Sequence, residues 1–195
     1  MPRGQNCYMS DRVSITIDNG IADVRLTRAD KRNALDSEMF RAIAAAGERL
    51  KTQAGVRCVV LSGEGKSFCA GLDMGSMNQL AGAPPANGEE QTNAGDINDG
   101  SITHLAQQIC WVWQELPMPV ISAVHGHALG GGIQLALGTD IRFVHPETKM
   151  SVRETYWGLV PDMTGTFMLG KLLRPDIAKE LTFTARVFSG AEAHE

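Results

Sequence analysis

Polar and apolar residues alternate in two neighbouring segments near the start of the chain. Residues 13–18 (VSITID) and 21–27 (IADVRLT) are both rich in β-branched side chains, and Asn19-Gly20 separates them. Asparagine and glycine tolerate the positive φ angles that a tight two-residue turn requires. The pattern therefore predicts an antiparallel β-hairpin over residues 13–27.

A helical pattern follows this hairpin. Asp36-Ser37-Glu38 is typical of a helix start, and the apolar residues after it recur at helical spacing as far as about Gln53. Residues 56–62 (VRCVVLS) form a short apolar run. Such a run predicts a strand that is buried on both faces.

The remainder of the chain alternates between short apolar runs and helical patterns. Further strands are predicted at 120–124, 140–144 and 149–152, and helices near 101–116, 132–138, 164–173 and 175–182. This alternation predicts an α/β fold with largely parallel strands, organised as one domain over residues 1–195. Residues 76–100 contain two consecutive prolines and no apolar period, so we expect a mobile loop there.

Composition and charge narrow the classes of function. The chain has 195 residues, 43% of them hydrophobic, and a formal net charge of -4. It has no basic stripe for nucleic acid, no apolar run that could cross a membrane and no apolar N-terminal signal. Its four cysteines lie far apart and match no metal or disulfide spacing. We therefore expect a reduced, cytoplasmic protein without nucleic-acid or membrane partners.

Several common catalytic motifs are absent from the sequence. Residues 63–67 (GEGKS) resemble the end of a phosphate-binding loop, but Val60 stands where that motif needs its first glycine. The glycines from Gly126 to Gly132 lack the spacing of a dinucleotide-binding fingerprint, and neither GxSxG nor HExxH occurs. His125 and His127 alone do not make a metal site, so no metal is expected.

Two glycine-containing loops of one kind remain. Residues 67–73 (SFCAGLD) and 125–132 (HGHALGGG) each follow an apolar strand, and the second leads into a helix. The N-terminus of a helix offers free N–H groups, and glycines let a substrate approach them closely. Two such loops directed at one point would form an oxyanion hole. Tight packing of helix against strand is the alternative explanation of the glycines.

Four segments together resemble the crotonase superfamily of enoyl-CoA hydratases and isomerases, including its dienoyl-CoA isomerases. They are KRNAL (31–35), SFCAGLD (67–73), PVISAVHGHALGGGIQLAL (119–137) and SVRETYWGLVPD (151–162). The resemblance extends from about residue 13 to 190. It implies an α/β fold, a spiral of ββα repeats, which members of the superfamily normally assemble as homotrimers or dimers of trimers.

The resemblance also implies roles for particular residues. The backbone N–H groups of Leu72 and Gly131 would hold the thioester oxygen of an acyl-CoA substrate. No separate cofactor is implied, because CoA is part of that substrate. The residues implied to line the substrate site are Lys31, Arg32, Ala34, Ala70, Gly71, Gly130 and Gln134. Lys31 and Arg32 would meet CoA phosphates there, or remain solvated surface charges.

The acid and base groups depart from the pattern of the related hydratases, which carry two glutamates. Gln134 occupies the first of those positions, and Glu154, twenty residues later, occupies the second. A glutamine side chain does not exchange protons near neutral pH. Asp162 matches an aspartate of the dienoyl-CoA isomerases, or it is a helix N-cap after Pro161. Glu154 and Asp162 are therefore the candidate catalytic carboxylates.

These residues favour double-bond isomerisation of an unsaturated acyl-CoA. The alternatives are hydration of a 2-enoyl-CoA, or a catalytically poor acyl-CoA-binding or assembly subunit. Members of the superfamily usually continue into C-terminal helices beyond the position of Glu195, so this sequence is either a fragment or a natural short member, and the last alternative belongs to the second case.

Overall fold

The computed structural model describes residues 6–75 and 102–195. The expected mobile loop at 76–100 lies outside the described residues. A six-stranded sheet has the order β1-β2-β3-β4-β5-β7. Its strands are β1 (Asn6–Met9), β2 (Val13–Asp18), β3 (Ile21–Leu26), β4 (Cys58–Gly63), β5 (Val120–Val124) and β7 (Ile141–Val144). The first three are antiparallel, whereas β3, β4, β5 and β7 run parallel to one another.

The N-terminal hairpin is confirmed. β2 and β3 pair in antiparallel register with Asp18 opposite Ile21, and the turn residues Asn19 and Gly20 have φ angles of 49° and 80°. β1 was not predicted from the sequence. It is a four-residue strand at the edge of the sheet, too short to show a period of its own.

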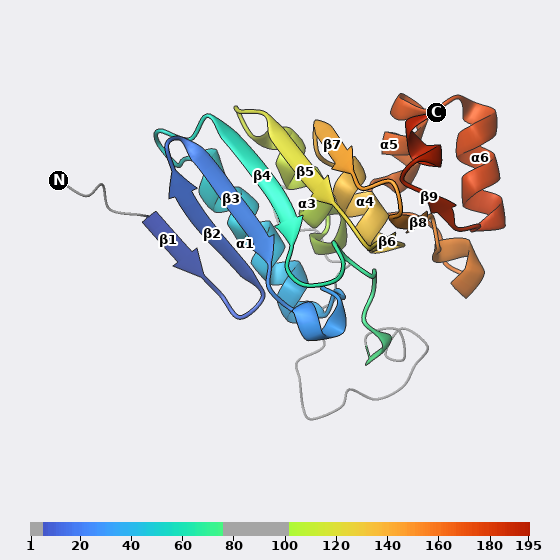
Figure 1. Ribbon diagram of the computed structural model, residues 1–195, viewed down its shortest axis with the longest axis horizontal. Helices are drawn as coiled ribbons and strands as arrows, with labels where there is room; N and C mark the ends of the chain where they lie inside the picture. Colours follow the sequence, from blue (N-terminus) through green and yellow to red (C-terminus); the bar gives the residue numbers. More distant parts are fainter. Residues whose placement is uncertain (1–5, 76–101) are drawn as a thin grey trace.

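Helices cover one face of the sheet. In Figure 1, α1 (Ser37–Lys51) and α3 (Leu105–Trp111) lie behind the strands, and the 3₁₀ helix η3 (Val112–Glu115) continues α3. The Asp36 side chain accepts a hydrogen bond from the Met39 N–H, which confirms the predicted start of α1. Since the helices lie on one face, β4 buries only Val59 and Leu61 completely. The prediction that β4 is buried on both faces was therefore wrong.

The second half of the chain adds a smaller layer. A three-stranded sheet has the order β6-β8-β9, with β6 (His127–Leu129), β8 (Lys149–Ser151) and β9 (Phe188–Ser189). The helices are α4 (Gly131–Leu137), α5 (Gly165–Leu172) and α6 (Pro175–Thr184), with the 3₁₀ helices η4 (Glu154–Trp157) and η5 (Glu192–His194). Figure 1 shows α5 and α6 at the opposite end of the molecule from β1.

A contiguous core connects the two sheets. One cluster of buried apolar side chains extends from Val13 to Phe188, and every residue of α4 is buried. No helix within residues 6–75 and 102–195 has the length and apolar character needed to cross a membrane. Because α4 is buried throughout and packs against β6, α3 and α5, it holds the loop before it in a fixed position.

Candidate active site

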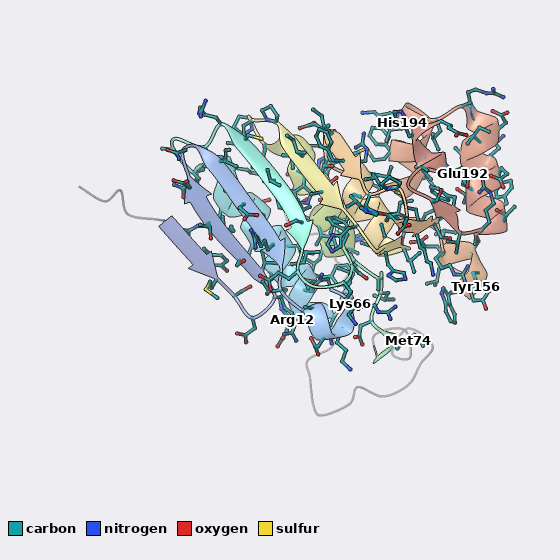
Figure 2. The ribbon with its side chains drawn as sticks, in the orientation of Figure 1. Arg12, Lys66, Met74, Tyr156, Glu192 and His194 are labelled. Carbon is teal, nitrogen blue, oxygen red and sulfur yellow. The ribbon has the colours of Figure 1, made fainter. Side chains whose placement is uncertain are left out.

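The two glycine-containing loops predicted from the sequence meet in space. Cys69, in the loop after β4, donates its N–H to the His127 carbonyl at 3.0 Å, and the Leu129 N–H donates to the Cys69 carbonyl at 3.2 Å. In Figure 2, the labelled Lys66 and Met74 mark the two ends of the first loop. The chain thus joins residues 67–73 directly to β6, the strand that leads into α4.

The Leu72 N–H points away from Leu35, the residue whose backbone pairs with this loop. Leu35 donates to the Gly71 carbonyl at 2.8 Å, and Asp73 donates to the Leu35 carbonyl at 2.9 Å. In such a parallel bridge, the residue between the two bonded ones directs its N–H to the opposite side. Among the described residues the Leu72 N–H has no hydrogen-bond acceptor. It is therefore free to bind a ligand.

Gly131 supplies a second free N–H beside the first. It is the first residue of α4, where backbone N–H groups have no partner within the helix, and it has none elsewhere in the described part of the chain. The preceding Gly130 has φ 53° and ψ -122°, a combination that L side chains do not adopt. A Cβ on Gly71 would lie only 3.7 Å from the Gly131 nitrogen. The donors of Leu72 and Gly131 thus lie on adjoining backbones.

The packing explanation of the glycines applies to Gly132. A Cβ at Gly132 would lie 2.2 Å from the Cys69 carbonyl oxygen, which leaves no room for any side chain. The glycines of this loop therefore have different roles. Gly130 permits the backbone turn, Gly131 presents its N–H and Gly132 allows the close approach of the two loops.

Glu154 lies beside the turn that presents the Gly131 N–H. Its side chain belongs to η4 and is buried, with 8% of the residue exposed. A Cβ on Gly130 would lie 3.4 Å from Glu154 Oε1. The labelled Tyr156, two residues along η4, projects from the surface instead (Figure 2). The chain therefore brings a buried carboxyl group to within contact distance of the residue preceding Gly131.

Burial raises the pKa of Glu154, and the nearby Asp162 carboxylate adds to that rise. The backbone N–H groups of Glu154 and Arg153 oppose the rise by favouring the charged form, and so does the hydrogen bond that Gln134 donates to Glu154. A carboxyl group whose pKa is raised toward neutrality is better matched to proton transfer at physiological pH. Glu154 therefore has the surroundings of a general base.

Gln134 reaches Glu154 from α4 and has both polar atoms occupied by the protein. Its Nε2 donates to Glu154 Oε1, and its Oε1 accepts from the Gly165 N–H at 2.9 Å. Only 1% of the residue is exposed. The side chain predicted to contact substrate is thus engaged with its own neighbours.

Asp162 lies on the exposed turn before α5. The helix begins at Gly165 with Thr164 as its N-cap residue, so the N-cap explanation of Asp162 is wrong. Its backbone carbonyl accepts from the Gln107 side chain at 3.1 Å. Its charge acts on Glu154, as described above, which links the two candidate carboxylates electrostatically.

The segment containing Lys31, Arg32 and Ala34 adjoins the loop after β4. The Ala70 N–H donates to the Arg32 carbonyl at 3.0 Å, and the side chains of Lys31 and Arg32 are exposed. Burial lowers the pKa of His127, and the nearby Arg32 charge lowers it further. The exposed cations therefore flank the loops that carry the two free N–H groups.

Two polar contacts near the site were missed by sequence reasoning. Arg28 Nη1 donates to Asp73 Oδ2 at 2.8 Å, and Ser67 Oγ lies 2.9 Å from His127 Nδ1. Each joins residues at least 45 positions apart, so no local pattern signals it. The only local signal was that Ser67, Asp73 and His127 belong to the two glycine-containing loops.

Cys69, in the loop after β4, is completely buried. Burial raises the pKa of the Cys69 thiol to about 12, so the thiol stays protonated and is a poor nucleophile. Within residues 6–75 and 102–195, no group of three or more His, Cys, Asp and Glu side chains is arranged to hold a metal ion.

Comparisons with known proteins agree with this geometry. The model of the enoyl-CoA hydratase/isomerase family matches residues 16–195. The Bacillus subtilis (strain 168) protein YngF, which carries the name enoyl-CoA hydratase/isomerase, is 33% identical over 96% of this chain and 67% of its own. The mitochondrial Delta(3,5)-Delta(2,4)-dienoyl-CoA isomerase of Rattus norvegicus is 32% identical over 89% of this chain and 52% of its own. The chain thus spans about half to two thirds of the length of these relatives.

Solved structures show the same fold. A Thermobifida fusca YX protein, solved in complex with acetoacetyl-CoA, has a TM-score of 0.75 and 33% identity, covering 93% of this chain and 69% of its own. An enoyl-CoA hydratase from Mycobacterium tuberculosis H37Rv has a TM-score of 0.76 and 26% identity, covering 95% and 66% of the two chains. The expectation of a crotonase fold is therefore confirmed, and the chain belongs to the enoyl-CoA hydratase/isomerase family, the crotonase superfamily.

Proposed function

We propose that this protein acts on an unsaturated acyl-CoA thioester through an enolate and moves its double bond. The observation that carries the proposal is the buried carboxyl group of Glu154 beside the free N–H groups of Leu72 and Gly131. Removing a proton next to a thioester carbonyl leaves negative charge on the carbonyl oxygen. Two preorganised N–H donors stabilise that charge more strongly than they stabilise the neutral carbonyl.

Glu154 carries the proton in this mechanism. Its carboxylate takes the proton from the carbon next to the thioester, and the resulting carboxylic acid returns it to a carbon further along the chain. Isomerisation needs one proton removed and one delivered, which a single carboxylate can perform by shuttling. Asp162, whose charge acts on Glu154, is proposed as a second proton-handling group that assists Glu154 in delivering the proton. The family matches of the chain support the thioester as the substrate class.

Hydration of a 2-enoyl-CoA is the second candidate, because several similar proteins are named as enoyl-CoA hydratases. Adding water requires the nucleophile to be deprotonated as well, and Gln134 supplies no second carboxylate for that step. A panel of 2-enoyl, 3-enoyl and 3,5-dienoyl thioesters distinguishes the two reactions. We expect double-bond movement to exceed water addition, whereas efficient hydration would establish the second candidate. Binding without either reaction would indicate an acyl-CoA-binding or assembly subunit.

We also propose that the protein assembles as a homotrimer or a dimer of trimers, on the basis of the family resemblance.

The protein should bind CoA thioesters and not NAD. The loops over residues 67–73 and 125–132 present free N–H groups to a carbonyl oxygen, whereas the sequence has no dinucleotide fingerprint. Calorimetric titration with a short acyl-CoA and, separately, with NAD measures this difference. Tight binding of NAD without binding of the acyl-CoA would refute the proposed substrate class.

Replacing Asp162 with Asn should slow isomerisation by about 10-fold or more while α-proton exchange changes less, because Asp162 assists delivery of the proton rather than its removal. Both rates can be measured on one 3-enoyl-CoA in deuterated buffer. If isomerisation and α-proton exchange slowed equally, Asp162 would have no separate role in delivering the proton.

A further inference from the structure

Gln134 is a buried residue at the contact of three elements. Its side chain extends from α4 between η4, which carries Glu154, and the N-terminus of α5 at Gly165. A Cβ on Gly165 would lie 2.5 Å from Gln134 Oε1, so the absence of a side chain at Gly165 admits the amide. The Gln134 side chain therefore occupies one defined place.

The contact with Gly165 also fixes which way the amide faces. A backbone N–H can only donate, so the atom of Gln134 that faces Gly165 at 2.9 Å must be its oxygen. The amide nitrogen then faces Glu154 Oε1 and donates to it. This assignment removes the usual ambiguity between the oxygen and nitrogen of a glutamine side chain.

The two oxygens of Glu154 are thereby made unequal. Oε1 accepts a hydrogen bond from Gln134, whereas Oε2 is buried and has no hydrogen-bond partner among the described residues. A proton on Oε1 would face the N–H of the amide and lose that bond. Oε2 is consequently the oxygen that is available to exchange a proton.

We propose that Gln134 is a positioning residue that clamps Oε1 of Glu154 to the N-terminus of α5 and leaves Oε2 to take and return the proton. The assignment of the proton step rests on the proposed function, but the clamp itself does not. Gln134 keeps its donor at every pH. A glutamate at position 134 could still accept the hydrogen bond from the Gly165 N–H. Its other oxygen, however, could lie against Oε1 of Glu154 only if the two carboxyl groups shared a proton.

The clamp can be tested without measuring activity. The Glu154 carboxyl carbon is followed by ¹³C NMR as the pH changes, in the full chain labelled at glutamate, and its signal is identified by its loss in Glu154→Gln. Gln134→Met keeps most of the side-chain volume but cannot donate. The pKa of Glu154 should rise by about one to two pH units, because a hydrogen bond to the charged form is lost.

The other titratable groups that act on Glu154 or are affected by it are the same in both proteins. They are Asp162, on the turn before α5, and Cys110, on α3, whose own pKa is raised by burial and further by Glu154. Gln114→Met is the matched control. Gln114 donates to the Gly138 carbonyl at 2.8 Å, at the other end of α4, so its loss should leave the titration of Glu154 unchanged.

A titration of Glu154 that is the same in Gln134→Met and in the unmodified protein would overturn the clamp. If circular dichroism shows that Gln134→Met does not fold, Gln134→Glu takes its place. In that variant the two carboxyl groups should titrate in two separated steps, and two independent, unshifted titrations would contradict the proposal. The pKa of Glu154 could shift as expected in a protein that shows no α-proton exchange. In that case Gln134 would remain a positioning residue for Glu154, and the proposed function would be refuted.

Discussion

Replacing Glu154 with Gln should slow double-bond isomerisation of a 3-enoyl-CoA by about 10²–10⁴-fold. The variant keeps the size of the side chain but removes the group that accepts the α-proton. The unmodified protein should lose activity as the pH falls through the pKa of Glu154, because the base works only when ionised. Since burial raises that pKa, the loss should begin above the ordinary pKa of a glutamate, about 4.3. Initial rates measured across pH test both statements.

Glu147→Gln is the matched control for this variant. Glu147 is an exposed residue between β7 and β8, so its replacement should leave the rate unchanged. If Glu154→Gln turned over substrate at the rate of the control, another group would have to be the base.

Replacing Gly131 with Pro should lower the turnover by about 10²–10³-fold, the typical effect of losing one oxyanion-hole donor. Proline has no N–H, but it is accepted at the first position of a helix, where Gly131 lies. The fold should therefore survive, which circular dichroism can verify alongside the rate.

Gly131→Ala separates the missing donor from simple crowding. In either variant a Cβ would meet Leu35 Cδ1 at 2.8 Å and Met163 Sδ at 3.1 Å, but only alanine keeps the N–H. We expect the alanine variant to be clearly more active than the proline variant. Equal activities in two folded variants would mean that the Gly131 N–H does not bind the thioester oxygen.

The elements with local signals were predictable from the sequence. Asn19-Gly20 defined the hairpin because its positive φ angles depend on those two residues, and Asp36 marked the start of α1 through its own side chain. The prediction that β4 is buried on both faces and the alternative N-cap role of Asp162 were wrong. Both depend on where neighbouring elements pack, which a local pattern does not contain.

The site was only partly predictable for the same reason. The resemblance singled out Leu72, Gly131 and Glu154 as candidates, but the direction of the Leu72 N–H follows from pairing with Leu35. The orientation of Gln134 follows from a backbone group 31 residues later in the chain. Such contacts are properties of the folded chain and not of any one segment.

The most direct test of the account is α-proton exchange on a saturated acyl-CoA in deuterated buffer. Such a thioester has no double bond to move or hydrate, so deuterium at the carbon next to the carbonyl reports proton removal alone. Mass spectrometry should detect that deuterium with the unmodified protein and far less with Glu154→Gln. Tight binding of the thioester without exchange above the rate in buffer would contradict enolate formation at this site.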